Sequence, residues 1–195
     1  MAGKEAPMAT RRAQTSRESR QLLIRAATEL FAERGFRQTT FADIANRSGI
    51  SRGSIPWHFG NKDGLLQAVI EELTVNMADL DSAAHDLADG LDRVRDQVRQ
   101  PTMRLLITLV AEAVEPGSPV HAFYAQLHDT IRKWVAGWVA ESDIPTGTSR
   151  ADFVAVVVGA IIGLHQQWRV APESVDLDRC FVALKAMSIS GRDAT

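Results

Sequence analysis

The sequence predicts an all-α protein of about nine helices, in which an N-terminal unit of three helices is followed by a larger helical unit. Apolar residues recur at helical spacing along most of the 195 residues, and no strand-like alternation competes with that pattern. Glycine, proline and capping residues separate the apolar segments at positions typical of helix ends. With 45% hydrophobic residues, a chain of this length can bury a substantial core.

The first helix is predicted over the segment SRESRQLLIRAATELFAER, which Gly35 ends. Its apolar residues form one stripe at helical spacing: Leu23, Ala26, Ala27, Leu30 and Phe31. A stripe of this kind is more typical of a core than of a binding surface. We therefore expect this helix to hold the next two helices at a fixed angle.

A second, short helix is predicted from near Phe41 to just before Gly49. Thr40 and Asp43 match a capping box, in which the hydroxyl satisfies an amide of the first turn and the acid lies at the positive helix end. Gly49 can adopt the left-handed conformation that closes a helix and turns the chain sharply. Two short helices joined in this way are the outline of a helix-turn-helix unit.

The third helix is predicted from about Arg52 to Phe59, with Ser51 as its cap. Its exposed face combines a guanidinium, a hydroxyl, an indole and an imidazole, which suit phosphates and base edges in a major groove. These groups belong to Arg52, Ser54, Trp57 and His58. Pro56 removes one amide, but few amides so near a helix start have intrahelical partners, so we expect only a local tightening.

Charge is divided sharply along the chain. Residues 1–62 contain 11 Lys and Arg against 5 Asp and Glu, a net charge of +6, whereas residues 63–195 contain 11 against 19, a net charge of −8. The basic part suits a polyanion such as DNA, although ordinary solvated charge could give the same division. Lys62 follows the cap Asn61 at the positive end of a long helix, where a cation is unfavourable unless an anion such as a phosphate approaches.

The segment from residue 16 to 66 resembles the tetracycline-repressor (TetR) family of bacterial transcription regulators. The stretches AATELFAERGF, TTFADIANRSGIS and HFGNKDGLL carry the resemblance in family order, and 195 residues is the family's usual length. Pro56 departs from the family, which more often has tyrosine there. The pattern and the resemblance together predict these DNA-binding residues: Thr39, Thr40, Arg47, Ser51, Arg52, Gly53, Ser54, Trp57, His58 and Lys62.

The resemblance implies a flexible basic tail over residues 1–15, a helix-turn-helix DNA-binding domain over 16–62, and a helical effector-binding and dimerisation domain over 63–195. Four arginines near the start could add phosphate or minor-groove contacts, or could be disordered solubilising charge: Arg11, Arg12, Arg17 and Arg20. Beyond residue 61 the apolar pattern predicts helices over Lys62–Leu80, Leu87–Gln100, Thr102–Glu115, Val120–Ser142, Arg150–Val170 and Leu177–Ile189.

The helix over Arg150–Val170 is too apolar for an ordinary surface helix and must be covered on several sides. Gly159 and Gly163, four residues apart, leave a flat strip where another helix can approach closely. In the family the last two helices pair with those of a second copy, so the resemblance implies a homodimer; a buried helix of a monomer is the alternative. The expected interface residues are Gly159, Gly163, Gln167, Phe181 and Leu184.

The resemblance also implies a pocket for a small-molecule effector, of unknown identity, inside the acidic part. Aromatic and polar side chains at helical spacing are candidates for its lining: His121, Tyr124, His128, Trp134, Trp138 and Trp168, with Phe123 beside them. Aromatic stripes at this spacing are also common in plain cores. An effector would release DNA by favouring a conformation in which the two DNA-binding units are misaligned.

Two other classes of function compete with a DNA-binding regulator. An enzyme is disfavoured because no nucleophile elbow, phosphate loop or cysteine-rich ligand set is present, and His121 with His128 lacks a nearby third metal ligand. A protein that coats DNA without sequence preference would discriminate poorly between a palindrome and random duplex. We expect no catalytic residue, cofactor, metal or membrane contact. The partners expected are an operator duplex, a second copy and the effector.

The single cysteine, the N-terminal sequence and the apolar runs bear on the compartment. Cys180 cannot form an internal disulfide, and the first 20 residues contain no apolar signal core. The longest apolar run, Phe153–Leu164, has 12 residues, which is short for a membrane span. These observations predict a cytoplasmic protein.

Overall fold

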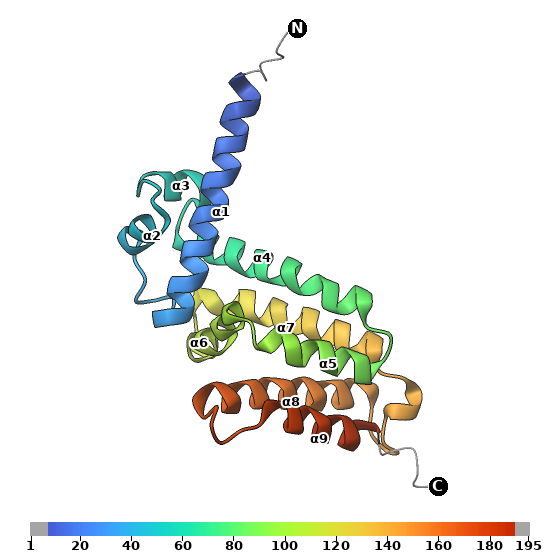
Figure 1. Ribbon diagram of the computed structural model, residues 1–195. Coiled ribbons are helices and arrows are strands. Elements are labelled where there is room, and N and C mark those ends of the chain that lie inside the picture. The colour runs from blue at the N-terminus through green and yellow to red at the C-terminus, as the bar shows by residue number, and fades with distance from the viewer. Residues whose placement is uncertain (1–7, 190–195) are drawn as a thin grey trace, which may run out of the picture.

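The computed structural model describes residues 8–189, and of these the side chains of all but 8–13, 76, 78–83 and 189. This part of the chain contains nine α-helices, two short 3₁₀ turns and no strand, as the sequence predicts (Figure 1). The helices are α1 (Met8–Arg34), α2 (Phe41–Ser48), α3 (Ser54–Phe59), α4 (Lys62–Ala83), α5 (Leu87–Val98), α6 (Arg104–Ala113), α7 (Pro119–Trp138), α8 (Arg150–Val170) and α9 (Leu177–Ile189).

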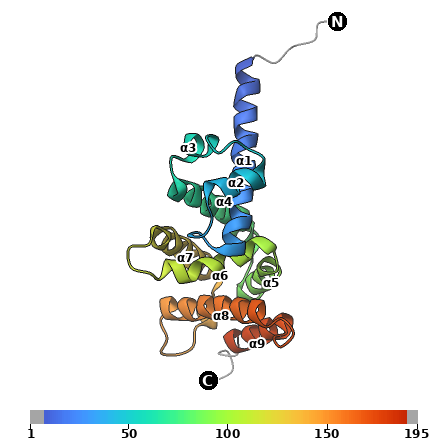
Figure 2. The same cartoon turned by 90° about the vertical axis from the view of Figure 1, so that its left-hand side faces the viewer.

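The helices form a small head and a layered body. The N-terminal half of α1 projects away from the rest of the molecule, and α2 and α3 lie beside its middle (Figures 1 and 2). Helix α4 runs from this head along the body, α5 and α7 form the next layer, and α8 with α9 closes the far end. Helix α6 packs against α1 and α7, between head and body.

Local signals in the sequence explain the ends of α2. The backbone N–H of Asp43 donates to Thr40 Oγ1 over 3.2 Å, and the N–H of Thr40 donates to Asp43 Oδ2 over 2.8 Å, which confirms the capping box. Hydrogen bonding to Thr40 lowers the pKa of Asp43, so the carboxylate stays ionised at the positive helix end. Gly49 closes α2 at φ 72°, in the left-handed region.

Two clusters of buried side chains form the core. The first joins α1 to α4 with α6 and α7, around fully buried residues such as Phe31, Ile44 and Leu65. The second joins α5, α7, α8 and α9 around Leu91 and Phe181. The first cluster crosses residue 62, so the head and the adjoining body share one core. A displacement of α4 or α6 therefore acts directly on the packing of the head.

Several predicted boundaries need correction. Helix α1 begins at Met8, so the predicted tail over residues 1–15 is helical from residue 8 onward, and residues 1–7 lie outside the described part. The segment ATRRAQTSR contains good helix formers, which favours that extension. Helix α7 ends at Trp138, before the predicted Ser142, because the carboxylate of Asp143 accepts a hydrogen bond from Ala140 N and holds a separate turn over Glu141–Asp143.

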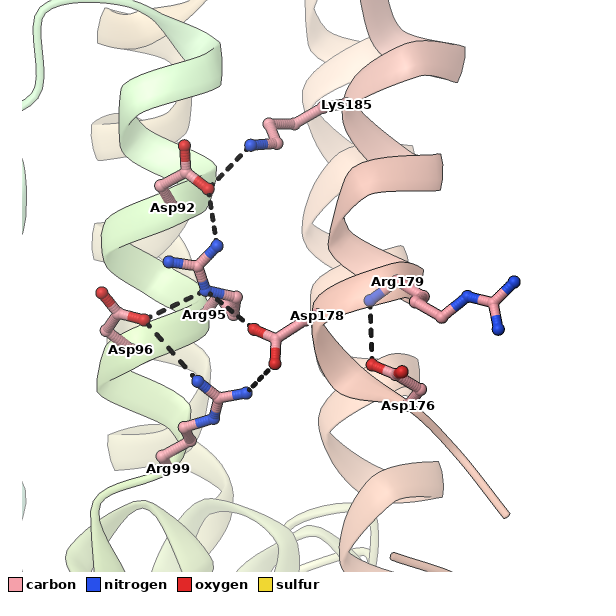
Figure 3. Close-up of polar contacts among 8 residues, drawn as sticks. All are labelled: Asp92, Arg95, Asp96, Arg99, Asp176, Asp178, Arg179 and Lys185. Carbon is pink, nitrogen blue, oxygen red and sulfur yellow. Dashed lines mark hydrogen bonds and ion pairs between the residues drawn. The ribbon is translucent and has the colours of Figure 1, made fainter. Parts of the chain in front are cut away.

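An ion-pair cluster fastens α9 to α5 (Figure 3). Arg95 lies within 3.4 Å of Asp92, Asp96 and Asp178, and Arg99 binds Asp178 over 2.7 Å. Lys185 of α9 donates to Asp92 of α5 over 2.7 Å. Each pair is partly exposed and contributes little alone, but together they fix the separation of the two helices.

Helix α8 is long and apolar enough to cross a membrane by length and composition, with a mean hydropathy of 1.3 over its most apolar 18 residues. Within the described residues it is the only such helix, and the core helix of a soluble protein meets the same test. Phe153, Val154, Val157, Val158 and Ile161 place one of its faces in the second core cluster.

Candidate DNA-binding surface and effector cavity

Helix α3 begins later than the sequence predicts, and this later start makes Pro56 tolerable within the helix. The helix begins at Ser54, after a turn in which Ser54 N donates to Ser51 O and Ile55 N donates to Arg52 O. Pro56 is the third helical residue, where an amide would have no intrahelical partner. Ser51 does not cap the helix as predicted; its hydroxyl instead shares a 2.7 Å hydrogen bond with that of Ser54.

The exposed face of α3 carries the predicted contact residues. Trp57 is 73% exposed, which is unusual for so large an apolar side chain and leaves its indole available to a partner. Arg52 and Gly53 are exposed in the preceding turn, whereas Ser54 and His58 are half-buried. His58 lies edge to face against Trp57 with ring centroids 4.5 Å apart, and burial lowers its pKa, so the imidazole is neutral at pH 7.

Two predicted contact residues have structural partners instead. Thr39 is 1% exposed, and its hydroxyl donates to Gly35 O over 2.9 Å, so the prediction of a DNA contact by this side chain is wrong. Arg47 pairs with Glu29 and Glu33 of α1 at 3.0 and 2.9 Å, which ties α2 to α1. Its guanidinium is thus committed within the head, unlike that of Arg52.

Lys62 lies at the start of α4, beside the turn that joins α1 to α2. Its ammonium donates to Arg37 O over 3.3 Å and lies 4.4 Å from the centre of the Phe36 ring. Burial lowers the pKa of Lys62, while the nearby Glu112 acts in the opposite direction. Thr40, the remaining predicted residue, is exposed at the start of α2.

The body contains a small internal cavity among α4 to α8. Its volume is about 60 Å³, and α4, α5, α6, α7 and α8 all contribute to its walls. Four of the six predicted pocket residues line it: Tyr124, His128, Trp134 and Trp138. Sequence reasoning missed others from separate helices: Met77, Gln97, Met103 and His165. His165 follows Ile161 by four residues on the buried face of α8, a spacing that could have indicated it.

Two predicted pocket residues lie outside the cavity. The His121 ring donates from Nδ1 to Ala113 O over 2.8 Å, which places it at the junction of α6 and α7. Trp168 stacks on His165 and carries the Arg169 guanidinium 4.6 Å from its ring centre. Phe123 lines a different hollow, a surface groove of about 360 Å³ between α4 and α7. Trp134 belongs to the walls of both hollows.

The polar groups in the cavity wall are few and largely neutral. The Tyr124 hydroxyl donates to Leu106 O of α6, and burial raises its pKa to about 12. Burial lowers the pKa of His165 to about 4, with the Arg169 charge contributing, and Arg169 Nε donates to His165 Nε2 over 3.3 Å. The indole N–H of Trp138 is buried and has no hydrogen-bond partner among the described residues.

His165 should make the protein less stable as the pH falls from 6.5 toward 4. Its pKa is lower in the folded state than in the unfolded chain, so below pH 6.5 the unfolded chain binds a proton that the folded state excludes. Each pH unit in this window is expected to lower the free energy of unfolding by about 1.4 kcal/mol. Urea unfolding of the wild type and of His165→Gln, at pH 7.5 and at pH 5.5, measures this loss of stability. An equal loss of stability in both proteins contradicts the assignment, and the exposed His85→Gln serves as control.

Helix α6 touches the cavity on one side and the head on the other. Leu106 lines the cavity, while Thr108 Oγ1 donates to Ala32 O of α1 over 3.1 Å. Glu112 Oε1 accepts the backbone N–H of Arg37 over 3.3 Å, in the turn that also holds Lys62. A change in the cavity that moves α6 would therefore strain contacts of the head.

Several apolar side chains of α8 and α9 are exposed. Val156 is 68%, Val182 59% and Met187 79% exposed, and Gly159 and Gly163 have open space where a Cβ would lie. Gln167 is exposed on the same helix, and Leu184 is half-buried. Phe181, predicted at a dimer interface, is 0% exposed and belongs to the core of the protomer itself, so that prediction is wrong for a side chain already enclosed by α5 and α8.

No three His, Cys, Asp or Glu side chains in the described part of the chain lie together as a metal site requires. His121 and His128 are accordingly engaged elsewhere, with Ala113 O and the Tyr124 ring respectively. The arrangement of the described residues thus offers a surface for a polyanion and a cavity for a small molecule.

Comparison with known proteins agrees with this arrangement. The family model of bacterial regulatory proteins of the tetR family matches residues 23–69. The HTH-type transcriptional regulator TtgR of Pseudomonas putida is 30% identical over 188 residues, which cover 87% of this chain and 89% of that protein.

Solved structures show the same fold over most of the chain. NalD, the secondary repressor of the MexAB-OprM multidrug efflux pump in Pseudomonas aeruginosa, superposes with a TM-score of 0.73 at 21% identity, over 93% of this chain and 100% of that one. A complex of SmeT with triclosan superposes with a TM-score of 0.70 at 20% identity, over 88% and 90%. Together with the near full-length match to TtgR, these findings show that the chain belongs to the tetR family of bacterial regulatory proteins, which are DNA-binding regulators of transcription.

Proposed function

We propose that the protein is a homodimeric repressor that binds a near-palindromic operator in the cytoplasm and is released from it by a small molecule held in the cavity. The observation that carries the proposal is the position of α6. This helix lines the cavity through Leu106 and holds the head through Thr108 and Glu112. A ligand that reshapes the cavity can in this way alter the placement of α3.

The chemistry of α3 supports recognition of a major groove. Arg52 is exposed and free to donate in a bidentate manner to a guanine or to a phosphate, and Trp57 can contact a thymine methyl or the sugar backbone. Thr40, Gly53, Ser54 and His58 border this surface. One short helix reads few bases, so affinity and spacing specificity require a second copy.

The exposed apolar side chains of α8 and α9 support association with a second copy. Large apolar side chains exposed on neighbouring helices are typical of interfaces. Gly159, Gly163 and Gln167 lie on the exposed side of α8, and the glycines permit close approach of another helix. A two-fold dimer would place two α3 helices in major grooves about 34–36 Å apart, or a longer turn-matched distance.

Names of similar proteins point in the same direction. NalD is described as a repressor, and SmeT was solved with triclosan, a small molecule. Repression by occupying a promoter and release by population shift account for both features: the effector must bind more tightly to a conformation with misaligned α3 helices.

Selection of bound fragments from genomic DNA tests the function. The full-length wild type should enrich one near-palindromic sequence, and the enriched duplex should be bound at least about 10³-fold more tightly than random duplex. Enrichment without a shared sequence would indicate a protein that coats DNA non-specifically and would contradict the proposal.

Arg52→Ala should weaken binding to the enriched duplex by about tenfold or more and relax selection at one base position. Lys62→Ala should weaken binding to all duplexes alike, because an ammonium next to the first turn of α4 meets phosphates without reading bases. Arg132→Ala, an exposed arginine on α7 far along the body, is the matched control. Titration of labelled duplexes measures all three, and unchanged affinity in both head variants would contradict the assignment of this surface.

A further inference from the structure

We propose that the effector is an uncharged, largely apolar molecule with one hydrogen-bond acceptor, and that the indole N–H of Trp138 donates to that acceptor. This inference rests on the proposed function, since it assumes that the cavity is the effector site. It adds the chemical class of the ligand and the residue that anchors it.

The cavity wall excludes a charged ligand. Among the described residues, the lining contains no Asp, Glu, Lys or Arg. A charge enclosed there would lose its hydration without gaining a partner of opposite sign. Burial also keeps the lining histidines His128 and His165 neutral at pH 7, so they cannot serve as cationic anchors. Apolar side chains make up most of the remaining wall, which suits an apolar body.

The Trp138 N–H is a fully buried donor of this wall that has no hydrogen-bond partner among the described residues. Trp138 is 5% exposed, and its Nε1 has no acceptor among the described residues. Buried donors are nearly always paired, so an unpaired one in a cavity wall marks a place for a ligand acceptor or an ordered water. Two other polar groups of the wall have partners within the protein: the Tyr124 hydroxyl donates to Leu106 O, and His165 Nε2 accepts from Arg169.

Gly90 of α5 fixes the orientation of the Trp138 ring. A Cβ at Gly90 would lie 2.5 Å from Cε3 and 2.7 Å from Cδ2 of the indole, so the ring packs directly on the backbone of α5. Cε3 belongs to the ring edge opposite the N–H. The indole atoms nearest to Gly90 therefore do not include the N–H, and this contact leaves the N–H without an acceptor on α5.

The size of the cavity indicates where the ligand makes room. A volume of about 60 Å³ is smaller than the ~150 Å³ cavity that holds a benzene molecule. Trp134 lines both the cavity and the surface groove of about 360 Å³ between α4 and α7. We infer that the ligand makes room by displacing this shared side chain, because the two hollows together reach the size range of small-molecule sites.

Quinoline and naphthalene form a matched pair of probes, because they share one shape and quinoline alone has an acceptor and is uncharged at pH 7.5. In calorimetric titrations, the full-length wild type should bind quinoline more tightly than the Trp138→Phe variant does. The ratio of quinoline affinity to naphthalene affinity should be about five- to tenfold higher in the wild type than in the variant. The charged analogues 2-naphthoate and 1-methylquinolinium should bind at least about tenfold more weakly than quinoline.

Trp134→Phe is the control, since it also shrinks an indole in the same cavity but removes no unpaired buried N–H; it should change both affinities without changing their ratio. An unchanged ratio in Trp138→Phe, equal binding of a charged analogue, or no binding of any probe would overturn the inference. Duplex binding of the same proteins without probe is measured in parallel. If the wild type bound no duplex but still showed the Trp138-dependent preference for quinoline, only the proposed DNA recognition would be refuted. If it bound duplex but showed no such preference, only the inferred ligand class would be refuted.

Discussion

Gly159→Arg is expected to convert the proposed dimer into monomers and to weaken binding to a two-half-site duplex by about 10²–10⁴-fold, because the second half-site contact is lost. The substitution places a long cation on the flat strip of α8, three residues after the exposed apolar side chain of Val156. Two such cations facing each other across a two-fold axis would be desolvated and would repel. Sedimentation equilibrium and duplex titration measure the two effects.

The protomer itself should tolerate this change. A Cβ at Gly159 meets no atom within 4 Å, so the new side chain extends into solvent when no second copy is present. Gly137→Arg is a matched control, because Gly137 is also an exposed glycine inside a helix with open space around it, but on α7. The control should remain dimeric and bind duplex normally. A Gly159→Arg protein that still sediments as a dimer would show that another surface forms the interface.

Local signals made the head predictable from sequence. The Thr40 and Asp43 capping box, the left-handed Gly49 and the apolar stripe of α1 each depend on residues within a few positions of one another. Such signals act before tertiary contacts form and survive in the folded chain. The start of α3 could not be predicted in the same way, because two turn hydrogen bonds at Ser51 and Arg52 replaced the expected side-chain cap.

Exposure was harder to predict because it depends on partners distant in sequence. Thr39 and Phe181 have residue types suited to a DNA contact and an interface, yet α1 encloses the first and the second core cluster encloses the other. Arg47 is drawn to Glu29 and Glu33, which lie one turn apart on α1. No sequence pattern within α2 predicts that ion pair.

The cavity shows the same limit. Aromatic spacing along α7 predicted Tyr124, His128, Trp134 and Trp138, because residues three and four apart share a helix face. The rest of the wall comes from α4, α5, α6 and α8, and only the packing of these helices decides which of their side chains meet. A second consequence of packing, the close contact of Gly90 with Trp138, has no counterpart in the sequence pattern.

Gly90→Ala is expected to weaken quinoline binding by about tenfold or more. The added methyl would lie 2.5 Å from Cε3 of Trp138, well inside the contact distance of two carbons, so one partner must move. Helix α5 is held by the ion pairs to α9 and by Arg169, which donates to Val98 O and Gln100 O over 2.8 Å. The indole is therefore the group that shifts, and the space open to it is the cavity.

Gly137→Ala separates this clash from the general effect of alanine in a helix. Both substitutions raise helix propensity by up to about 1 kcal/mol, and Gly137 adjoins Trp138 in the chain but has open space around it. Gly137→Ala should therefore keep the wild-type affinity for quinoline, measured by calorimetry, and quinoline should still release it from the duplex. Gly90→Ala should stay bound to the duplex at quinoline concentrations that release the wild type and Gly137→Ala. Equal release from all three would mean that Trp138 does not shape the site through which the ligand acts.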